Sequence, residues 1–276
     1  MGHLIPSASA CPVEIVRVSQ AGQEVRSDLA AAEEPLEIRL QGTSFIVTMR
    51  TPGADRELAA GFLLSERIIA GGADLRSIRH CEDTIDIGNV LDVMLIGEAA
   101  TRATAVLADR RFVAATSACG VCGRRSIDDL LRAVPRVLGA LRVTAPLISS
   151  LPGRLRRRQD LFEETGGLHA AALFDGDGGI VAVAEDVGRH NAVDKVIGSQ
   201  VLEESLPLSE RILFVSGRTS FEIVQKAIMA GVPIVAAVSA PSSLAIALAR
   251  DAGVTLIGFV RGETFNLYTG RERISA

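Results

Sequence analysis

The second half of the chain alternates between short apolar segments of strand character and longer segments of helical character. The strands are predicted at residues 170–174, 180–184, 211–215, 234–238 and 255–259, and the helices at residues 191–203, 219–230 and 242–251. The sequence DGDGG (residues 175–179) predicts a hairpin between the first two strands. Regular alternation of strand and helix is typical of a largely parallel sheet covered by helices, so we expect an α/β domain here.

An uncharged run at residues 227–249 is long enough to cross a bilayer. Gly231, Pro233 and Pro241 divide it into a helix end, a short apolar strand and a new helix. We therefore expect a buried strand and no transmembrane segment.

The first third of the chain predicts a small α+β unit. Residues 36–40 and 44–49 predict a hairpin, a helix is expected from Asp55 to about Ile68, and further strands at residues 90–96 and 102–107. Residues 1–30 have weak periodicity, with an edge strand expected at 13–18. We place an N-terminal α+β domain at residues 1–117 and an α/β domain at residues 118–276.

Composition limits the function classes. The chain of 276 residues is 48% hydrophobic and has a net charge of −4, which argues against a general nucleic-acid binder. Four cysteines without regular spacing argue against a secreted disulfide scaffold, and the N-terminus lacks the pattern of a secretory signal. These features favour a reducing cytoplasm.

Two of the four cysteines, Cys119 and Cys122, lie together in the motif CGVCG (residues 119–123). The motif follows a strand-like stretch and precedes Arg124, Arg125 and a predicted helix start, and both features favour a reactive thiolate. The alternatives are a buried structural pair and a zinc site completed by His80 and Cys81. A zinc deaminase would need His-x-Glu and a Pro before the first Cys, whereas here Ala118 precedes Cys119 and His169 is followed by two alanines.

Arginine dominates residues 124–158, which hold nine arginines, no lysine and two aspartates. Solvated helix and linker faces are the usual place for such residues. Alternatively, arginine beside a reactive cysteine suits the binding of phosphates or of an acidic protein partner.

Three predicted strands end in polar loops that lead into helices, at residues 185–191, 216–220 and 239–243. Helix N-termini offer unpaired N–H groups to anions, and Arg189 and Arg218 add charge, so we expect Ser216, Gly217, Arg218 and Ser239 to bind a nucleotide-like ligand. Alternatively, Thr219 and Glu222 form a capping box that serves only the helix. His190 and His169 are each either structural residues or proton carriers.

The chain closely resembles the FdhD family, the accessory sulfurtransferases of formate dehydrogenase. The similarity extends over most of the chain from about residue 36. The matching stretches are TPG (51–53), ELAAGF (57–62), CGVCG (119–123), TGGLHAAALF (165–174), EDVGRHNAVDK (185–195), SGR (216–218), FEIVQK (221–226), SAPSSL (239–244) and GF (258–259). One departure is Arg67, where the family commonly has Gly, and it is expected to affect a turn rather than the chemistry.

The resemblance implies that the protein accepts sulfur from a cysteine desulfurase as a persulfide. The resemblance further implies that the protein transfers this sulfur to the molybdenum bis(guanine dinucleotide) cofactor destined for formate dehydrogenase. Cys119 would hold the persulfide and Cys122 would assist or resolve. The resemblance also implies a cytidine-deaminase-like sheet without a metal, a homodimer and a chaperone role toward the dehydrogenase's catalytic subunit. The implied cofactor contacts lie near the last strand, at Phe259, Val260, Arg261, Gly262, Glu263 and Thr264, with His190 a further candidate. A guanine nucleotide is the expected mimic of the cofactor.

Two other classes of function remain open from the residues alone. One is a nucleotide-binding redox regulator in which the cysteine pair forms a disulfide switch. The other is a zinc-dependent nucleobase enzyme, which metal analysis would identify.

Overall fold

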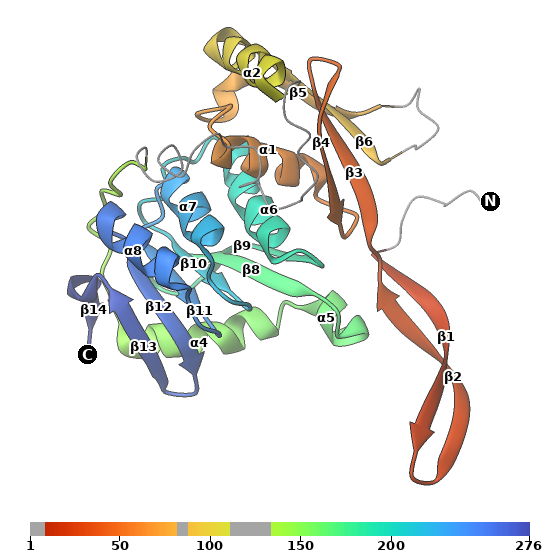
Figure 1. The fold of residues 1–276 in the computed structure, drawn as a ribbon. Coiled ribbons are helices and arrows are strands. Elements are labelled where there is room, and N and C mark those ends of the chain that lie inside the picture. The colour runs from red at the N-terminus through yellow and green to blue at the C-terminus, as the bar shows by residue number, and fades with distance from the viewer. Residues whose placement is uncertain (1–8, 82–87, 111–133) are drawn as a thin grey trace.

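Two separate sheets organise the described part of the protein. The computed structural model describes residues 9–81, 88–110 and 134–276 (Figure 1). Cys119, Cys122, the arginines at 124, 125 and 132, and the predicted domain boundary at residues 117 and 118 lie outside these ranges. The described residues have a mixed α+β architecture.

The larger sheet has six strands in the order β13-β12-β11-β10-β8-β9. Their bounds are β8 (His169–Phe174), β9 (Ile180–Asp186), β10 (Ile212–Val215), β11 (Ile234–Ala237), β12 (Thr255–Arg261) and β13 (Thr264–Thr269). Each expected strand of this half is present, and the hairpin predicted at residues 175–179 joins β8 to β9. The expectation of a largely parallel sheet is wrong, because only β10, β11 and β12 are parallel to one another. Short connections bring β9 and β13 back antiparallel to the preceding strand, and β8 pairs antiparallel with β10.

Both faces of this sheet are buried, because alternate side chains of each strand enter different cores. On β10, Leu213 and Val215 join one cluster, and Ile212 and Phe214 join the other. Helices α6 (Arg189–Leu202), α7 (Phe221–Met229) and α8 (Ser243–Ala252) cover the first face, and α4 (Ala145–Arg156) covers the second (Figure 1). The short helix α5 (Asp160–Thr165) leads into β8, and β7 (Val143–Thr144) pairs with β14 (Ile274–Ser275) after the turn η2 (Arg271–Arg273).

The smaller sheet has the order β4-β3-β6-β5 and packs against helix α1. Its elements are β3 (Glu34–Leu40), β4 (Thr43–Arg50), α1 (Asp55–Ser65), η1 (Gly72–Asp74), β5 (Leu75–His80), β6 (Val90–Leu95) and α2 (Gly97–Arg110). The predicted hairpin at residues 36–49 and the helix from Asp55 are confirmed.

The strand predicted at residues 102–107 is wrong, because these residues belong to helix α2. Ala99 and Ala103, four residues apart, are both fully buried, so they lie on the same helix face. Arg102 donates to the carbonyl of Ile68 and pairs with Asp74, which holds the helix in place. The buried face and the contacts of Arg102 stabilise the helix, although Thr104 and Val106 are β-branched.

A long hairpin of β1 (Ala10–Ser19) and β2 (Gly22–Ala31) projects away from the body of the molecule (Figure 1). The strand predicted at residues 13–18 lies within β1, whereas β2 was not predicted. Val16, Val18 and Val25 are 56%, 69% and 64% exposed. Because the hairpin has no core of its own, its sequence lacks the buried alternation by which strands are recognised.

Helices α1 and α6 connect the smaller sheet to the larger one. They approach so closely that glycine is required on both: a Cβ at Gly61 would lie 2.0 Å from the carbonyl oxygen of Asp194. Arg67, just beyond α1, has a φ of 60°, the left-handed conformation that favours glycine. The departure from the family pattern at this position therefore lies in a turn, as expected.

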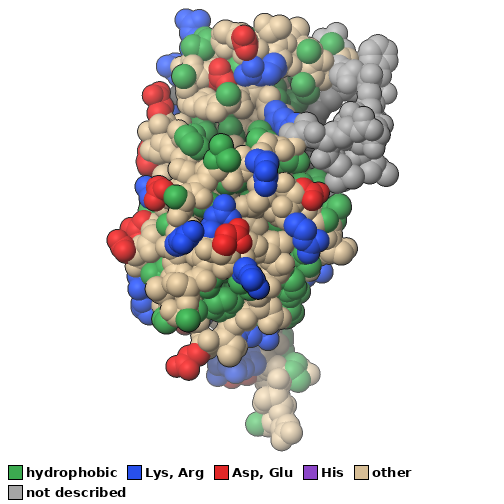
Figure 2. All heavy atoms as spheres, turned by 90° about the vertical axis from the view of Figure 1, so that its left-hand side faces the viewer, with side chains coloured by type: hydrophobic (Ala, Val, Ile, Leu, Met, Phe, Trp, Pro, Cys, Tyr) green, Lys and Arg blue, Asp and Glu red, His purple; other side chains and the backbone are tan. Residues whose placement is uncertain are grey.

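None of the helices in the described ranges combines the length and the apolar character needed to cross a membrane. The uncharged run at residues 227–249 forms the end of α7, all of β11 and the start of α8, as predicted. On the face drawn in Figure 2, basic and acidic side chains are interspersed and no continuous basic stripe crosses the described surface.

Candidate functional site

The loops that follow the three parallel strands lie side by side, as the sequence predicts. Thr219 and Pro241 form a bridge between the first two loops, supported by a hydrogen bond of 3.1 Å from the Thr219 amide to the Ala240 carbonyl. The amide of Phe259 donates to the carbonyl of Ser239 at 3.2 Å, which brings the third strand to the same place. We call residues 216–220, residues 239–243 and the segment 258–264, which comprises the end of β12 and the turn into β13, the strand-end loops.

The first strand-end loop is fixed against β8. The Ser216 hydroxyl accepts a hydrogen bond of 2.9 Å from the Ala170 amide, so this side chain has a structural role. Gly217 permits a close approach, because a Cβ there would lie 3.3 Å from Nδ1 of His169. His169 is half-buried, and burial together with the charges of Arg189 and His190 lowers its pKa below the usual value of 6.5. Neutral His169 therefore lies beside the loop.

Two helix starts at this edge of the sheet leave polar groups without partners, whereas the Ser242 hydroxyl caps the start of α8 by accepting from the amide of Ala245. Neither Gly188 at the start of α6 nor Ser220 at the start of α7 makes a side-chain cap. Two buried atoms, Nε of Arg189 and Oγ1 of Thr219, make no hydrogen bond to a described residue. The predicted capping box of Thr219 and Glu222 is thus not formed, because Glu222 binds a different group. Uncapped helix starts beside an arginine suit an anion.

The third strand-end loop combines an unusual backbone with an exposed cation. Phe259 has a φ of 55°, which is rare for a side chain of this size, and Arg261 lies 5.7 Å from its ring. Gly262, with a φ of 56°, has open space where a side chain would be. Glu263 and Thr264 are exposed, whereas Val260 is 1% exposed and points into the core. Of this predicted contact segment, Val260 can offer only its backbone to a ligand.

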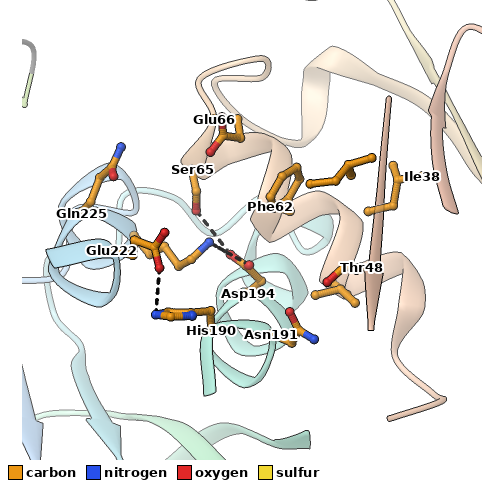
Figure 3. Close-up of a pocket in the computed structure, with 13 residues that line it drawn as sticks. Ile38, Thr48, Phe62, Ser65, Glu66, His190, Asn191, Asp194, Glu222 and Gln225 are labelled. Carbon is orange, nitrogen blue, oxygen red and sulfur yellow. Dashed lines mark hydrogen bonds and ion pairs between the residues drawn. The ribbon is translucent and has the colours of Figure 1, made fainter. Parts of the chain in front are cut away.

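His190 lies between the strand-end loops and a pocket. Its Nε2 atom is 3.0 Å from the Ser220 hydroxyl and 2.9 Å from a carboxylate oxygen of Glu222. His190 also lines the pocket that α1, α6, α7, β3 and β4 form (Figure 3). Sequence reasoning did not find Glu222 as a partner of His190, because its position in the first turn of a helix was explained by capping.

A buried ion pair forms one wall of this pocket. Lys226 of α7 donates to both oxygens of Asp194 at 2.8 Å, and Ser65 of α1 donates to Asp194 at 3.3 Å (Figure 3). Complete burial raises the pKa of Asp194, and the charge of Lys226 opposes that rise. The ion pair and the hydrogen bond from Ser65 together connect α1, α6 and α7.

The other charged neighbours of His190 in the sequence have structural roles. Asp186 pairs with Lys195 at 2.8 Å and accepts the Thr51 amide at 3.2 Å, and Lys195 also donates to the Thr51 carbonyl. Glu185 accepts the amides of Leu161 and Phe162 at the start of α5. These contacts fix the segment that carries Arg189 and His190.

The two cysteines in the described ranges and two arginines of the arginine-rich segment lie in different parts of the fold. Cys11 is exposed on the projecting hairpin and Cys81 is half-buried after β5. Within the described ranges, no group of three or more His, Cys, Asp or Glu side chains is arranged to hold a metal ion. Arg154 donates to the Gly178 carbonyl, and Arg156 pairs with Glu163 and lies over the Phe162 ring.

Fold and site together define an α+β protein with two main sheets and with strand-end loops that suit an anionic ligand. Comparison with known families identifies it further: the model of the FdhD/NarQ family matches residues 31–275, and the chain belongs to that family. The match begins at the end of the projecting hairpin.

Similar proteins cover nearly the whole chain. A protein of Nocardia farcinica named sulfur carrier protein FdhD is 52% identical over 267 residues, which cover 94% of this chain and 93% of that protein. A protein of the same name from Streptomyces coelicolor is 49% identical and covers 95% of this chain and 94% of its own length. The crystal structure described as a formate dehydrogenase accessory protein of Desulfotalea psychrophila has a TM-score of 0.76 at 25% identity. It covers 97% of this chain and 100% of that one. These comparisons support the general fold, and a specific likeness to cytidine deaminases stays a prediction.

Proposed function

We propose that this protein is a sulfur carrier that holds sulfur as a persulfide on Cys119. It would receive the sulfur from a cysteine desulfurase and deliver it to the molybdenum bis(guanine dinucleotide) cofactor needed by formate dehydrogenase. The observation that carries the proposal is the similarity, near 50% identity over almost the whole chain, to proteins named as sulfur carriers. The cysteine motif and the strand-end loops supply the two groups that this task requires.

The proposed transfer of sulfur requires no metal ion bound to this chain. The Cys119 thiolate attacks the outer sulfur of the desulfurase persulfide, and the desulfurase cysteine leaves as a thiolate. Attack by the Cys122 thiolate on the inner sulfur of the Cys119 persulfide would then form a disulfide between the two cysteines and release the outer sulfur as sulfide, which the bound cofactor would take up. A cellular dithiol reductant restores both thiols. Cys122 is the resolving cysteine in this scheme.

The strand-end loops, together with the start of α6 beside Gly217, would hold the phosphates of the cofactor, which is the substrate of the transfer. Arg218 is exposed and makes no ion pair with a described residue, and Arg189 has a buried Nε without a partner. Two uncapped helix starts add backbone N–H groups. These groups would bind and orient a dinucleotide phosphate, and guanosine diphosphate is the simplest probe.

Mass spectrometry of Cys119 after incubation with a desulfurase and cysteine tests the proposal. We expect the Cys119 peptide to gain the mass of one sulfur atom and to lose it on treatment with a thiol. A disulfide between Cys119 and Cys122 that cycles without any bound sulfane sulfur would instead support the redox regulator.

Three further parts of the proposal have separate tests. A homodimer is expected in light scattering, and the dehydrogenase's catalytic subunit, toward which a chaperone role is proposed, is expected to co-purify with the protein from the cytoplasm. Metal analysis of the purified protein is expected to find no stoichiometric zinc. Stoichiometric zinc lost only with unfolding would favour the zinc-dependent alternative.

A further inference from the structure

His169, the first residue of β8, lies at the edge of the larger sheet where the parallel strands end. Because β8 is antiparallel to β10, the start of β8 lies beside the end of β10, and the Ser216 amide donates to the Ala170 carbonyl at 2.9 Å. On its other side, His169 is paired with Asp186, the last residue of β9. The antiparallel direction of β8 therefore brings an imidazole ring to the first strand-end loop.

The ring of His169 lies between this loop and the start of α6. A Cβ at Gly217 would be 3.3 Å from Nδ1 of His169 and 3.8 Å from Cδ of Arg189, so both side chains lie against this glycine. Neither ring nitrogen of His169 makes a hydrogen bond to a described residue. An imidazole has two nitrogens that can donate or accept, so this half-buried ring has hydrogen-bonding capacity to offer a ligand.

The charged groups around His169 are mostly positive. Burial, followed by the charges of Arg189 and His190 on α6, lowers its pKa below the ordinary value of 6.5. Arg218 of the first strand-end loop acts in the same direction, whereas Asp186 of β9 opposes it. Asp186 is itself paired with Lys195 at 2.8 Å. The ring is therefore mainly neutral near pH 7, and the charge that surrounds it favours an anion.

We propose that the His169 ring contacts the phosphate of a nucleotide held at the strand-end loops and takes up one proton from solvent as the phosphate binds. The inference rests on the proposed function, because it takes these loops as the phosphate site. A phosphate beside the ring offsets the repulsion from Arg189 and Arg218, so the protonated form becomes favourable. The imidazolium then donates a charge-assisted hydrogen bond to a phosphate oxygen.

Such a contact makes the affinity for phosphate depend on pH. Uptake of one proton with each bound ligand strengthens binding by up to about ten-fold for each unit by which the pH falls. This holds between the pKa of His169 in the complex, which is the higher one, and its pKa in the free protein. A ring with only a structural role would not give this dependence, because its proton affinity would be the same with and without ligand.

NMR of the full-length protein tests the proposal, with guanosine diphosphate as the probe. The Cε1–H resonance of His169, assigned from its loss in His169→Gln, reports the pKa of the ring. We expect that pKa to lie below 6.5 in the free protein and to rise above that value when guanosine diphosphate is saturating. This measurement is made on the wild type, so it does not depend on the stability of a variant.

Calorimetry at about pH 6 and about pH 8 provides a second measurement. Between these values the wild type should gain about ten-fold more affinity for guanosine diphosphate than His169→Gln does. The variant accounts for the titration of the nucleotide itself, since a terminal phosphate has a pKa of about 6. Circular dichroism of the variant checks that the fold is retained.

The outcomes separate this contact from the proposed function. If the pKa of His169 does not rise when guanosine diphosphate binds, the proposal is overturned and the strand-end loops remain a nucleotide site. An equal gain of affinity in the wild type and His169→Gln has the same meaning. Absence of binding by the wild type would overturn both the contact and the phosphate site, whereas sulfur loading on Cys119 tests the carrier function separately.

Discussion

Gly198 of α6 lies directly against the backbone of Glu57 on α1. A Cβ at Gly198 would be 1.8 Å from the carbonyl oxygen of Glu57 and 2.7 Å from the amide nitrogen of Gly61. Since neither atom belongs to a movable side chain, the two helices can cross here only with glycine. The contact holds together the smaller sheet and the segment that carries Arg189 and His190.

Gly198→Ala should therefore destabilise the protein strongly. We expect the free energy of unfolding to fall by about 3 kcal/mol or more, because the new methyl group forces the helices apart. Denaturant unfolding followed by circular dichroism measures the change. The matched control is Gly153→Ala in α4, where the nearest atom to a new Cβ is 3.9 Å away. That variant should gain about 0.5–1 kcal/mol from helix propensity, and near-wild-type stability of Gly198→Ala would contradict the role of the crossing.

Periodicity predicted the elements that are buried on both faces. Strand β11 and its flanking helices follow from an apolar run interrupted by Gly231, Pro233 and Pro241. The direction of the outer strands did not follow, because a strand's hydrophobic pattern does not determine which neighbour it pairs with. The hairpin of β1 and β2 was largely missed, since its side chains are mostly exposed and bury no core face.

Only part of the candidate site could be predicted from the sequence. Parallel strands bring their carboxyl ends together, so the meeting of Ser216, Ser239 and Phe259 follows from topology. The pairing of His190 with Glu222 depends on how α6 and α7 are rotated about their axes. The spacing of residues along the sequence does not determine that rotation. The pocket also needs Phe62 and Ser65 from α1, which only the glycine crossing brings close.

Cys119→Ala should abolish the activation of the target dehydrogenase while leaving the fold intact. Loss of the thiolate removes the only atom proposed to hold the transferred sulfur. Dehydrogenase activity in cells that carry only the variant measures the effect, and circular dichroism checks the fold.

The other cysteines provide controls for this prediction. Cys122→Ala should have an equal or milder effect, whereas replacement of Cys11, exposed on the projecting hairpin, or of Cys81, after β5, should leave activation unchanged. Full activation by Cys119→Ala would exclude it as the carrier.

Arg218→Ala and Arg261→Ala should each weaken the binding of guanosine diphosphate by about ten-fold to a hundred-fold, as expected for the loss of one charge-assisted contact. Calorimetry measures the affinity. Loading of sulfur on Cys119 should survive both changes, which separates ligand binding from sulfur chemistry. Arg250→Ala, on the last turn of α8, is the control. Unchanged affinity in both variants, or no binding by the wild type, would remove the strand-end loops from the site.

His169 should make the protein less stable in acid. Burial, then the charges of Arg189 and His190, lower its folded-state pKa below the ordinary value of 6.5, so the unfolded chain binds this proton first as the pH falls. Its contribution to the free energy of unfolding is therefore complete above about pH 6.5 and is lost as the pH falls toward the folded-state pKa. Denaturant unfolding across this range should show a steeper loss for the wild type than for His169→Gln. Bound guanosine diphosphate should reduce the difference, because a phosphate near His169 favours the protonated ring. Equal slopes for the wild type and His169→Gln without ligand would show that this histidine does not carry the effect.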